Sequence, residues 1–151
     1  MCEIHIGGKE HEYLSIQLRG RDASEQEFGD YFERNWLTAL VEVRAGDFQA
    51  SIRCQFQAED FVHLRGSLQD LLDWKDSSAD FSTLEGWLAA VFMMDERGRI
   101  TLIGDLIDRP MDGNRLHFQL ALDQSFLPSI LSDLARVIEK YPVIGTPPLP
   151  Q

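Results

Sequence analysis

The sequence predicts an α+β domain in which a twisted or curved antiparallel sheet of about six to seven strands is covered by two helices. Several short segments alternate apolar and polar side chains, as strands with one buried face do. At two places, about residues 58–74 and 125–141, the spacing of apolar residues changes to that of a helix. The alternating segments are joined by short connections that contain turn residues, which is typical of antiparallel neighbours.

The first half of the chain contains three alternating segments, of which residues 11–19 are the first. A long polar connection over residues 21–34 follows, and connections of this length are more often functional or mobile than inert. Two segments around a turn at residues 45–47 then give the clearest predicted hairpin. Its return strand places these side chains on one face: Phe48, Ala50, Ile52, Cys54 and Phe56.

The first predicted helix has apolar residues at helical spacing and two acids in its first turn, where the helix dipole favours them. Trp74 is expected to close this helix on the core. Two strands follow at about residues 81–94 and 100–108, and a third at residues 115–122. Gly86, inside the first of these strands, predicts a bulge or a close backbone approach.

The second predicted helix carries Pro128 in its first turn, where a missing donor costs little, and Pro142 stops it. The length of the chain predicts a single domain over residues 1–151. We expect its two ends, residues 1–10 and the proline-containing residues 142–151, to be peripheral.

The charge of the chain restricts its partners. There are 25 Asp and Glu against 14 Lys and Arg, which gives a formal net charge of -11. Such a surface repels phosphate backbones and anionic lipid, so we expect neither nucleic acid nor a membrane as a partner. It would attract a basic protein and accelerate the encounter. Solubility alone is the competing explanation for this charge.

The cysteines and the first residues favour the cytoplasm. Cys2 and Cys54 form neither a disulfide framework nor a metal pair, and Cys54 fits a buried position in a strand. The chain opens without the basic and apolar regions of a signal peptide. No apolar run approaches the ~20 residues that a membrane-spanning helix needs.

No group of residues has the pattern of a catalytic or metal centre. His5 and His11 lack the spacing of zinc ligands. Cys54 lies within a strand rather than at a helix start that would activate its thiol. Asp105 and Asp108 would point to opposite faces of a continued strand, which makes them a poor acid–base pair. We therefore predict a protein that is not an enzyme, with no cofactor and no metal.

One cluster of residues in the long polar connection has the chemistry of a docking surface. Carboxylates there pair with basic partners, and aromatic rings supply desolvated contact area. The cluster consists of Glu27, Asp30, Tyr31, Phe32, Glu33 and Trp36. The binding candidates among them are Glu27, Asp30, Tyr31 and Glu33. The competing interpretation is that the rings fill the core while the acids solvate a loop, and we favour a core position for Trp36.

Two alternative functions remain open. The chain could bind a small ligand on the concave side of a curved sheet, with Arg115 and His117 among the polar groups. It could also assemble with itself through a self-complementary interface, and the sequence does not define an oligomeric state.

The chain resembles a family of small bacterial proteins, the WapI-type immunity proteins, from about Tyr13 to Pro142. The motifs that carry this resemblance are spread along the strands and at the start of the last helix. They are Asn35-Trp36-Leu37, the returning strand from Phe48 to Phe56, Leu84-Glu85-Gly86, Asn114-Arg115-Leu116 and the segment from Leu122 to Pro128.

The resemblance implies a cytoplasmic antidote that binds and neutralises a contact-delivered toxin without covalent chemistry. Toxins of this class are often nucleases that act on tRNA, and nucleases carry basic surfaces. The acidic balance of this chain is compatible with such a partner. The family supplies no catalytic residues.

Overall fold

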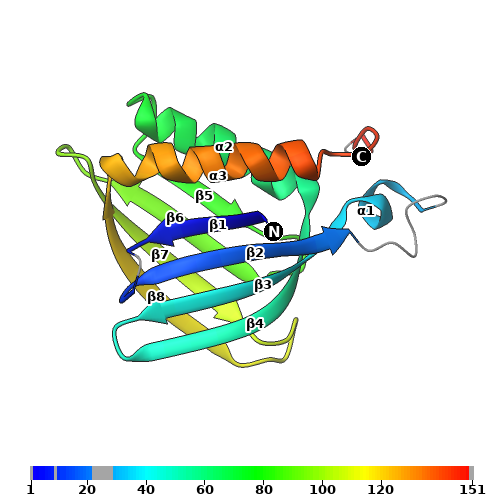
Figure 1. The fold of residues 1–151 in the computed structure, drawn as a ribbon, viewed down its shortest axis with the longest axis horizontal. Helices are drawn as coiled ribbons and strands as arrows, with labels where there is room; N and C mark the ends of the chain where they lie inside the picture. Colours follow the sequence, from blue (N-terminus) through cyan, green and yellow to red (C-terminus); the bar gives the residue numbers. More distant parts are fainter. Residues whose placement is uncertain (1, 9, 22–28, 150–151) are drawn as a thin grey trace.

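The computed structural model describes residues 2–8, 10–21 and 29–149, and within them the chain forms two antiparallel sheets of four strands each (Figure 1). The first sheet has the order β1-β2-β3-β4, and the second has the order β5-β6-β7-β8. The first sheet and its helices comprise β1 (Cys2–Gly7), β2 (Tyr13–Arg21), α1 (Tyr31–Arg34), β3 (Trp36–Ala45), β4 (Phe48–Gln57) and α2 (Ala58–Leu72). The second half comprises β5 (Ser78–Ser82), β6 (Leu88–Met94), β7 (Arg99–Ile107), β8 (Arg115–Asp123), a 3-10 turn η1 (Gln124–Phe126) and α3 (Leu127–Lys140).

The chain therefore builds the same unit twice, a four-stranded meander followed by a helix. The two long helices pack side by side along one side of the molecule (Figure 1). Each helix also covers the first strand of the opposite unit, since α2 packs on β5 and α3 packs on β1. Because each helix packs on a strand of the other unit, the two units share one hydrophobic core.

The predicted single sheet of about six to seven strands is thus wrong, although the α+β class and the two long helices are confirmed. One additional strand is β1, whose Ile4 and Ile6 are fully buried. The expectation that residues 1–10 are peripheral is wrong for this strand. Another strand appears because the predicted strand 81–94 is two strands, separated by a turn in which Gly86 has a φ of +77°.

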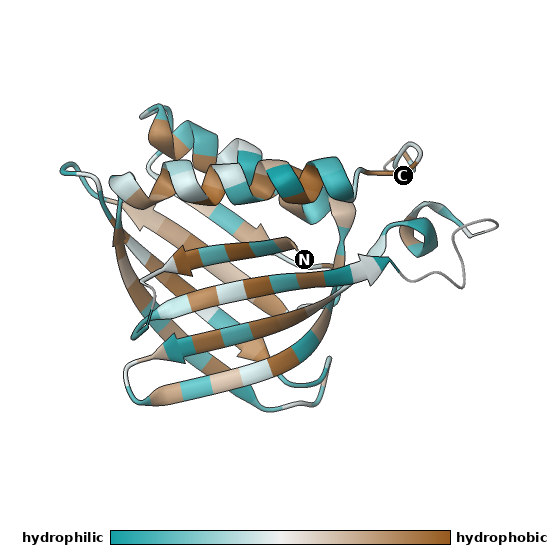
Figure 2. Cartoon of the chain, in the orientation of Figure 1, coloured by the Kyte–Doolittle hydropathy of each residue, from teal (hydrophilic) through white to brown (hydrophobic). Residues whose placement is uncertain are grey.

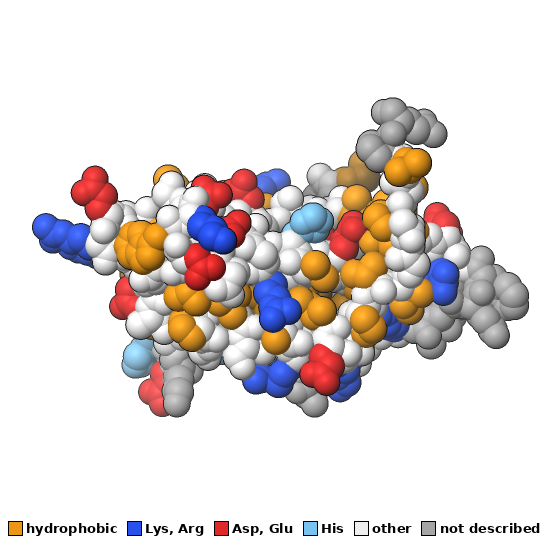
Figure 3. Space-filling view, turned by 90° about the horizontal axis from the view of Figure 1, so that it is seen from above, with side chains coloured by type: hydrophobic (Ala, Val, Ile, Leu, Met, Phe, Trp, Pro, Cys, Tyr) orange, Lys and Arg blue, Asp and Glu red, His pale blue; other side chains and the backbone are white. Residues whose placement is uncertain are grey.

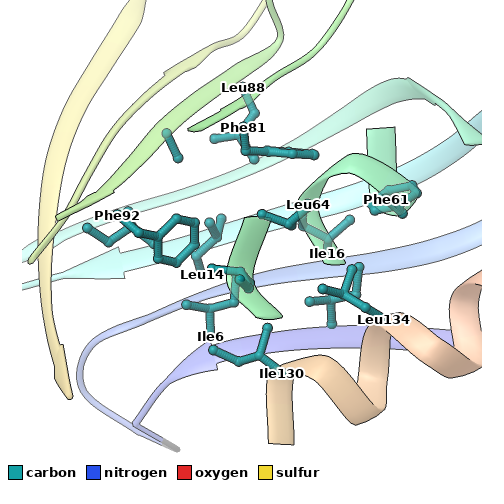
Figure 4. Close-up of a cluster of buried hydrophobic side chains, with 14 of the residues drawn as sticks. Ile6, Leu14, Ile16, Phe61, Leu64, Phe81, Leu88, Phe92, Ile130 and Leu134 are labelled. Carbon is teal, nitrogen blue, oxygen red and sulfur yellow. The ribbon is translucent and has the colours of Figure 1, made fainter. Parts of the chain in front are cut away.

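A single hydrophobic core fills the space between the two sheets and the two long helices. Along the strands, hydrophobic residues alternate with hydrophilic ones, so that each sheet turns one apolar face inward (Figure 2). Figure 4 shows Ile16, Phe61, Phe81 and Ile130 from both sheets and both helices within this core. Cys54 is buried as predicted, whereas Phe48 extends past the core at the start of β4 and is 68% exposed.

Three aromatic rings join the two halves of the core. Phe56 on β4, Phe61 on α2 and Phe81 on β5 pack against one another, with ring centroids 5.4 to 6.1 Å apart. All three centroid distances lie in the range of favourable aromatic pairs. The three rings therefore connect the first sheet, its helix and the second sheet at one point.

Trp74 does not close α2 on the core as predicted. The helix ends at Leu72 because two backbone bonds cap it, from the Trp74 N–H to the Leu71 carbonyl (3.2 Å) and from the Lys75 N–H to the Asp70 carbonyl (2.8 Å). This pattern needs a residue in the left-handed conformation just after the helix. Trp74 has a φ of +58° there, and its side chain is 54% exposed.

Candidate docking surface

The predicted docking cluster lies around α1, at the end of the molecule where β2 and β3 connect (Figure 1). Asp30 begins this short helix by accepting a hydrogen bond from the Glu33 N–H at 2.9 Å, as N-cap carboxylates do. The side chains of Asp30 and Glu33 are both exposed. Glu27 lies outside the described residues. The structure thus places two of the predicted carboxylates at the surface, where a partner can reach them.

Tyr31 joins this surface to the start of α2. Its hydroxyl donates a hydrogen bond to Glu59 Oε2 at 2.8 Å. Burial, this hydrogen bond and the nearby carboxylates raise the pKa of Tyr31 to about 12, so the phenol stays protonated at neutral pH. The sequence did not indicate Glu59 as part of the cluster. In the sequence, Glu59 is explained as an acid that the helix dipole favours in the first turn of α2, and only the folded chain brings it to Tyr31.

Among the described residues, the aromatic side chains of the cluster do not belong to the hydrophobic core, so the core position favoured for Trp36 is wrong. The rings of Tyr31 and Phe32 meet edge to face with centroids 5.3 Å apart. Both residues, and Trp36 at the start of β3, are partly buried. The Tyr31 ring is thus partly buried against Phe32, while its hydroxyl bonds to Glu59.

The Arg21 side chain holds the backbone beneath this surface. Arg21 donates to the Arg34 carbonyl at 3.2 Å and also to the carbonyl of Pro142. Burial lowers the pKa of Arg21 from its ordinary value. Because the Arg21 guanidinium is engaged by backbone carbonyls, it does not cancel the exposed charges of Asp30 and Glu33 through a direct ion pair.

Asn35 ties the C-terminal segment to this end of the molecule. Its buried side chain donates to the carbonyls of Tyr31 (2.7 Å) and Ile144 (2.9 Å) and accepts from the Ile144 N–H (2.8 Å). Val143 packs against the core. The expectation that residues 142–151 are peripheral is therefore wrong for the segment up to Ile144, because its polar backbone atoms are satisfied by a buried side chain.

A polar cleft lies between the first half of α2 and β5 at the edge of the second sheet. It has a volume of about 290 Å³ and is lined by Asp60, His63, Ser67, Asp80, Phe81 and Ser82. Asp60 also accepts a hydrogen bond from the Gln57 N–H at 2.8 Å. Burial outweighs this bond and raises the pKa of Asp60 to about 6.

We expect Asp60→Asn to stabilise the protein above about pH 7. The pKa of Asp60 is higher in the folded state than its value of about 3.9 in an unfolded chain, so the carboxylate destabilises the fold above the folded pKa. This penalty fades as the pH falls through 6 toward 4. Asparagine keeps the acceptor for Gln57 and removes the charge, so the gain should be about 1–2 kcal/mol after allowance for partial exposure.

The measurement for Asp60 is denaturant unfolding of both proteins at several pH values. The difference in the free energy of unfolding should shrink steadily between pH 7 and pH 4. A constant difference over this interval would show that Asp60 titrates normally in the folded protein.

Arg115 and His117 do not lie on a concave face, so this part of the ligand-binding expectation is wrong. Both are exposed on the outer face of β8, because the alternate residues Phe118, Leu120 and Leu122 fill the core. His117 Nδ1 lies 3.1 Å from Asp105 Oδ1 on the neighbouring strand. The inner faces of both sheets are occupied by the hydrophobic core and leave these polar groups on the outside.

No helix in the described part of the chain is both long and apolar enough to cross a membrane. In the same part of the chain, no three His, Cys, Asp or Glu side chains are grouped in a way that could hold a metal ion.

The fold and the surface define the chain as an α+β protein with a doubled four-strand-and-helix unit and exposed acidic groups beside aromatic rings. The sequence model of the Immunity protein WapI-like family matches residues 5–142, so the chain belongs to this family. No curated protein is significantly similar to it.

Among solved structures, one similar chain comes from the crystal structures of Trypanosoma bruciei MRP1/MRP2. The similarity covers 91% of this chain and 83% of that chain, with 10% sequence identity and a TM-score of 0.48. A likeness of this degree carries no argument about function.

Proposed function

We propose that this protein is an immunity protein that neutralises a cognate, contact-delivered toxin in the cytoplasm by non-covalent occlusion. The observation that carries the proposal is the match of almost the whole chain to the WapI-like immunity family. Such proteins act by binding, so the chain needs a partner surface rather than a reaction centre. Among the described residues, the α1 end offers one, with exposed Asp30 and Glu33 beside Tyr31 and Glu59.

The partner that fits this surface is a basic protein, such as a nuclease with a substrate groove lined by Lys and Arg. Oriented carboxylates attract such a groove at a distance, and partly buried rings provide contact area once water is expelled. The net charge of -11 adds a long-range attraction. On the face that carries the helices, acidic side chains are interspersed with Lys, Arg and hydrophobic side chains (Figure 3). Local clusters, rather than a uniform acidic face, must therefore define the contact.

The proposal is tested by titrating this protein into an activity assay of its cognate toxin. A protein that acts by occlusion inhibits in proportion to the complex formed, so a tight complex gives complete inhibition at equal amounts of the two proteins. An enzyme that inactivates the toxin would instead abolish its activity at far less than equal amounts, and the inhibition would increase with incubation time. Failure to inhibit the toxin, or inhibition by trace amounts, would contradict occlusion.

The docking surface is tested by Glu27→Lys/Glu33→Lys, combined with Asp30→Asn. Asparagine is chosen at position 30 because it keeps the N-cap of α1, which lysine would remove. We expect association with the toxin to slow about tenfold at low salt and to become less dependent on salt. Stopped-flow binding measures the rate, and the melting temperature should stay unchanged.

The matched control for this variant is Glu85→Lys/Glu139→Lys/Asp47→Asn, which changes the net charge by the same amount at exposed sites elsewhere. An equal decrease of the association rate in the control would show that net charge alone accelerates the encounter with the toxin. In that case the α1 end is not the docking surface.

A further inference from the structure

A cavity among the described residues lies on the first sheet, and its lining residues differ from those of the α1 surface. It has a volume of about 610 Å³. This volume is within the range that small-molecule sites occupy. The cavity extends over three neighbouring strands, β2, β3 and β4, and its lining residues are Arg19, Thr38, Ala39, Leu40, Arg53, Cys54 and Gln55.

Two arginines flank this cavity from opposite sides of β3. Arg53 on β4 is the direct cross-strand partner of Leu40. Arg19 lies on β2 in a bulge between the pairs Leu18–Ala39 and Gly20–Thr38. Neighbouring strands are about 4.8 Å apart, so the two arginines start roughly 10 Å from each other, and both side chains are long enough to reach a group held between them.

Neither arginine is neutralised by a carboxylate among the described residues. The ion pairs found there involve other basic groups. Within the described residues, Arg19 donates a side-chain hydrogen bond from Nη2 to Gln17 Oε1 at 3.5 Å, and both Arg19 and Arg53 are exposed. In a chain with a net charge of -11, two guanidinium groups that form no ion pair with the described carboxylates therefore concentrate positive charge at one cavity.

The remaining lining residues suit an organic molecule rather than a bare ion. Leu40 is partly exposed between the two arginines and offers an apolar floor. The Thr38 hydroxyl donates to the Gly20 carbonyl at 3.3 Å and keeps its lone pairs available as acceptors. Gln55, the cross-strand partner of Thr38, adds an amide donor and acceptor.

We propose that this cavity binds a small organic anion. Arg19 and Arg53 hold its carboxylate or phosphate group, since guanidinium groups match the planar arrangement of such oxygens. Leu40 contacts the apolar part of the molecule, while Thr38 and Gln55 bond to its polar substituents. The lining residues of this site belong to β2, β3 and β4, and none of them is among the residues proposed for the α1 docking surface.

The experiment follows amide resonances of the whole protein during titration with phenyl phosphate, benzoate, inorganic phosphate and phenol at constant ionic strength. We expect saturable shifts at residues 19, 38–40 and 53–55 with the aromatic anions. Inorganic phosphate should bind about tenfold more weakly than phenyl phosphate because it lacks the apolar part, and phenol should give no saturable shift. The stronger of phenyl phosphate and benzoate identifies the preferred anionic group.

The variant Arg19→Gln/Arg53→Gln should weaken binding of the stronger aromatic anion at least about tenfold. The control Arg65→Gln/Arg97→Gln makes the same change in net charge at exposed positions outside the cavity, and should stay within about twofold of the original protein. Melting temperatures show whether each variant is folded. Absence of saturable shifts, equal binding by the folded Arg19→Gln/Arg53→Gln variant, or equal loss in the control would overturn the proposal.

Discussion

Replacing Phe61 with alanine is expected to lower the free energy of unfolding by about 4 kcal/mol. Phe61 is fully buried on α2, and its ring lies 5.4 Å from that of Phe56 and 6.1 Å from that of Phe81. The substitution removes a large apolar side chain and leaves a cavity where the first sheet, α2 and the second sheet meet. Since the surrounding strands are held by their ladders, the space can collapse only in part.

Denaturant unfolding of the Phe61→Ala protein measures this loss. Phe48→Ala is the control, because Phe48 is 68% exposed and its truncation should change stability by less than about 0.5 kcal/mol. Similar losses for the two variants would mean that the three rings do not form the centre of the core. Phe81→Ala should resemble Phe61→Ala, although the two losses will not add since the rings are in contact.

Replacing Asn35 with alanine is expected to cost about 3 kcal/mol. The side chain is fully buried and bonds to Tyr31 and to both backbone polar groups of Ile144. Arg21 also approaches Asn35 Oδ1 at 3.4 Å. Alanine would leave these groups without partners, so the fold must either bury them unsatisfied or release the segment that follows α3.

Hydrogen exchange of the Ile144 amide distinguishes these two results of Asn35→Ala. If the segment is released, we expect the Ile144 amide to exchange as fast as an amide in a free terminus. The exchange rates of amides in β7 should change only as much as the global stability of the protein changes. Asn114→Ala is the control. Among the described residues, the exposed Asn114 side chain bonds to Asp108, and its removal should cost less than about 1 kcal/mol. Retained protection of the Ile144 amide would show that Asn35 does not hold the segment.

The secondary structure could be predicted from local patterns because alternation and helical spacing record which faces are buried. The hairpin of β3 and β4 and the stripes of α2 and α3 are examples. The number of strands could not be predicted in full. In β1 only Ile4 and Ile6 mark the buried face, and the turn between β5 and β6 falls inside a run of apolar residues.

The candidate site likewise could be predicted only in part from the sequence. The sequence indicated Asp30, Tyr31 and Glu33 because carboxylates alternate with rings in one polar segment. It gave no sign of Glu59, which reaches Tyr31 from a helix 28 residues away in the chain. Likewise, Arg19 and Arg53 lie in separate strands and become one cavity only when β2 and β4 flank β3.

By itself the sequence determined the α+β class, both long helices, the acidic charge and the membership of an immunity family. Tertiary structure alone decided that eight strands form two sheets, that each helix covers the opposite unit, and which charges become neighbours. The physical reason is how far apart the contacting residues lie along the chain. The spacing of apolar residues within one segment shows which of its faces is buried. Sheet order and charged clusters depend instead on contacts between segments that are distant along the chain.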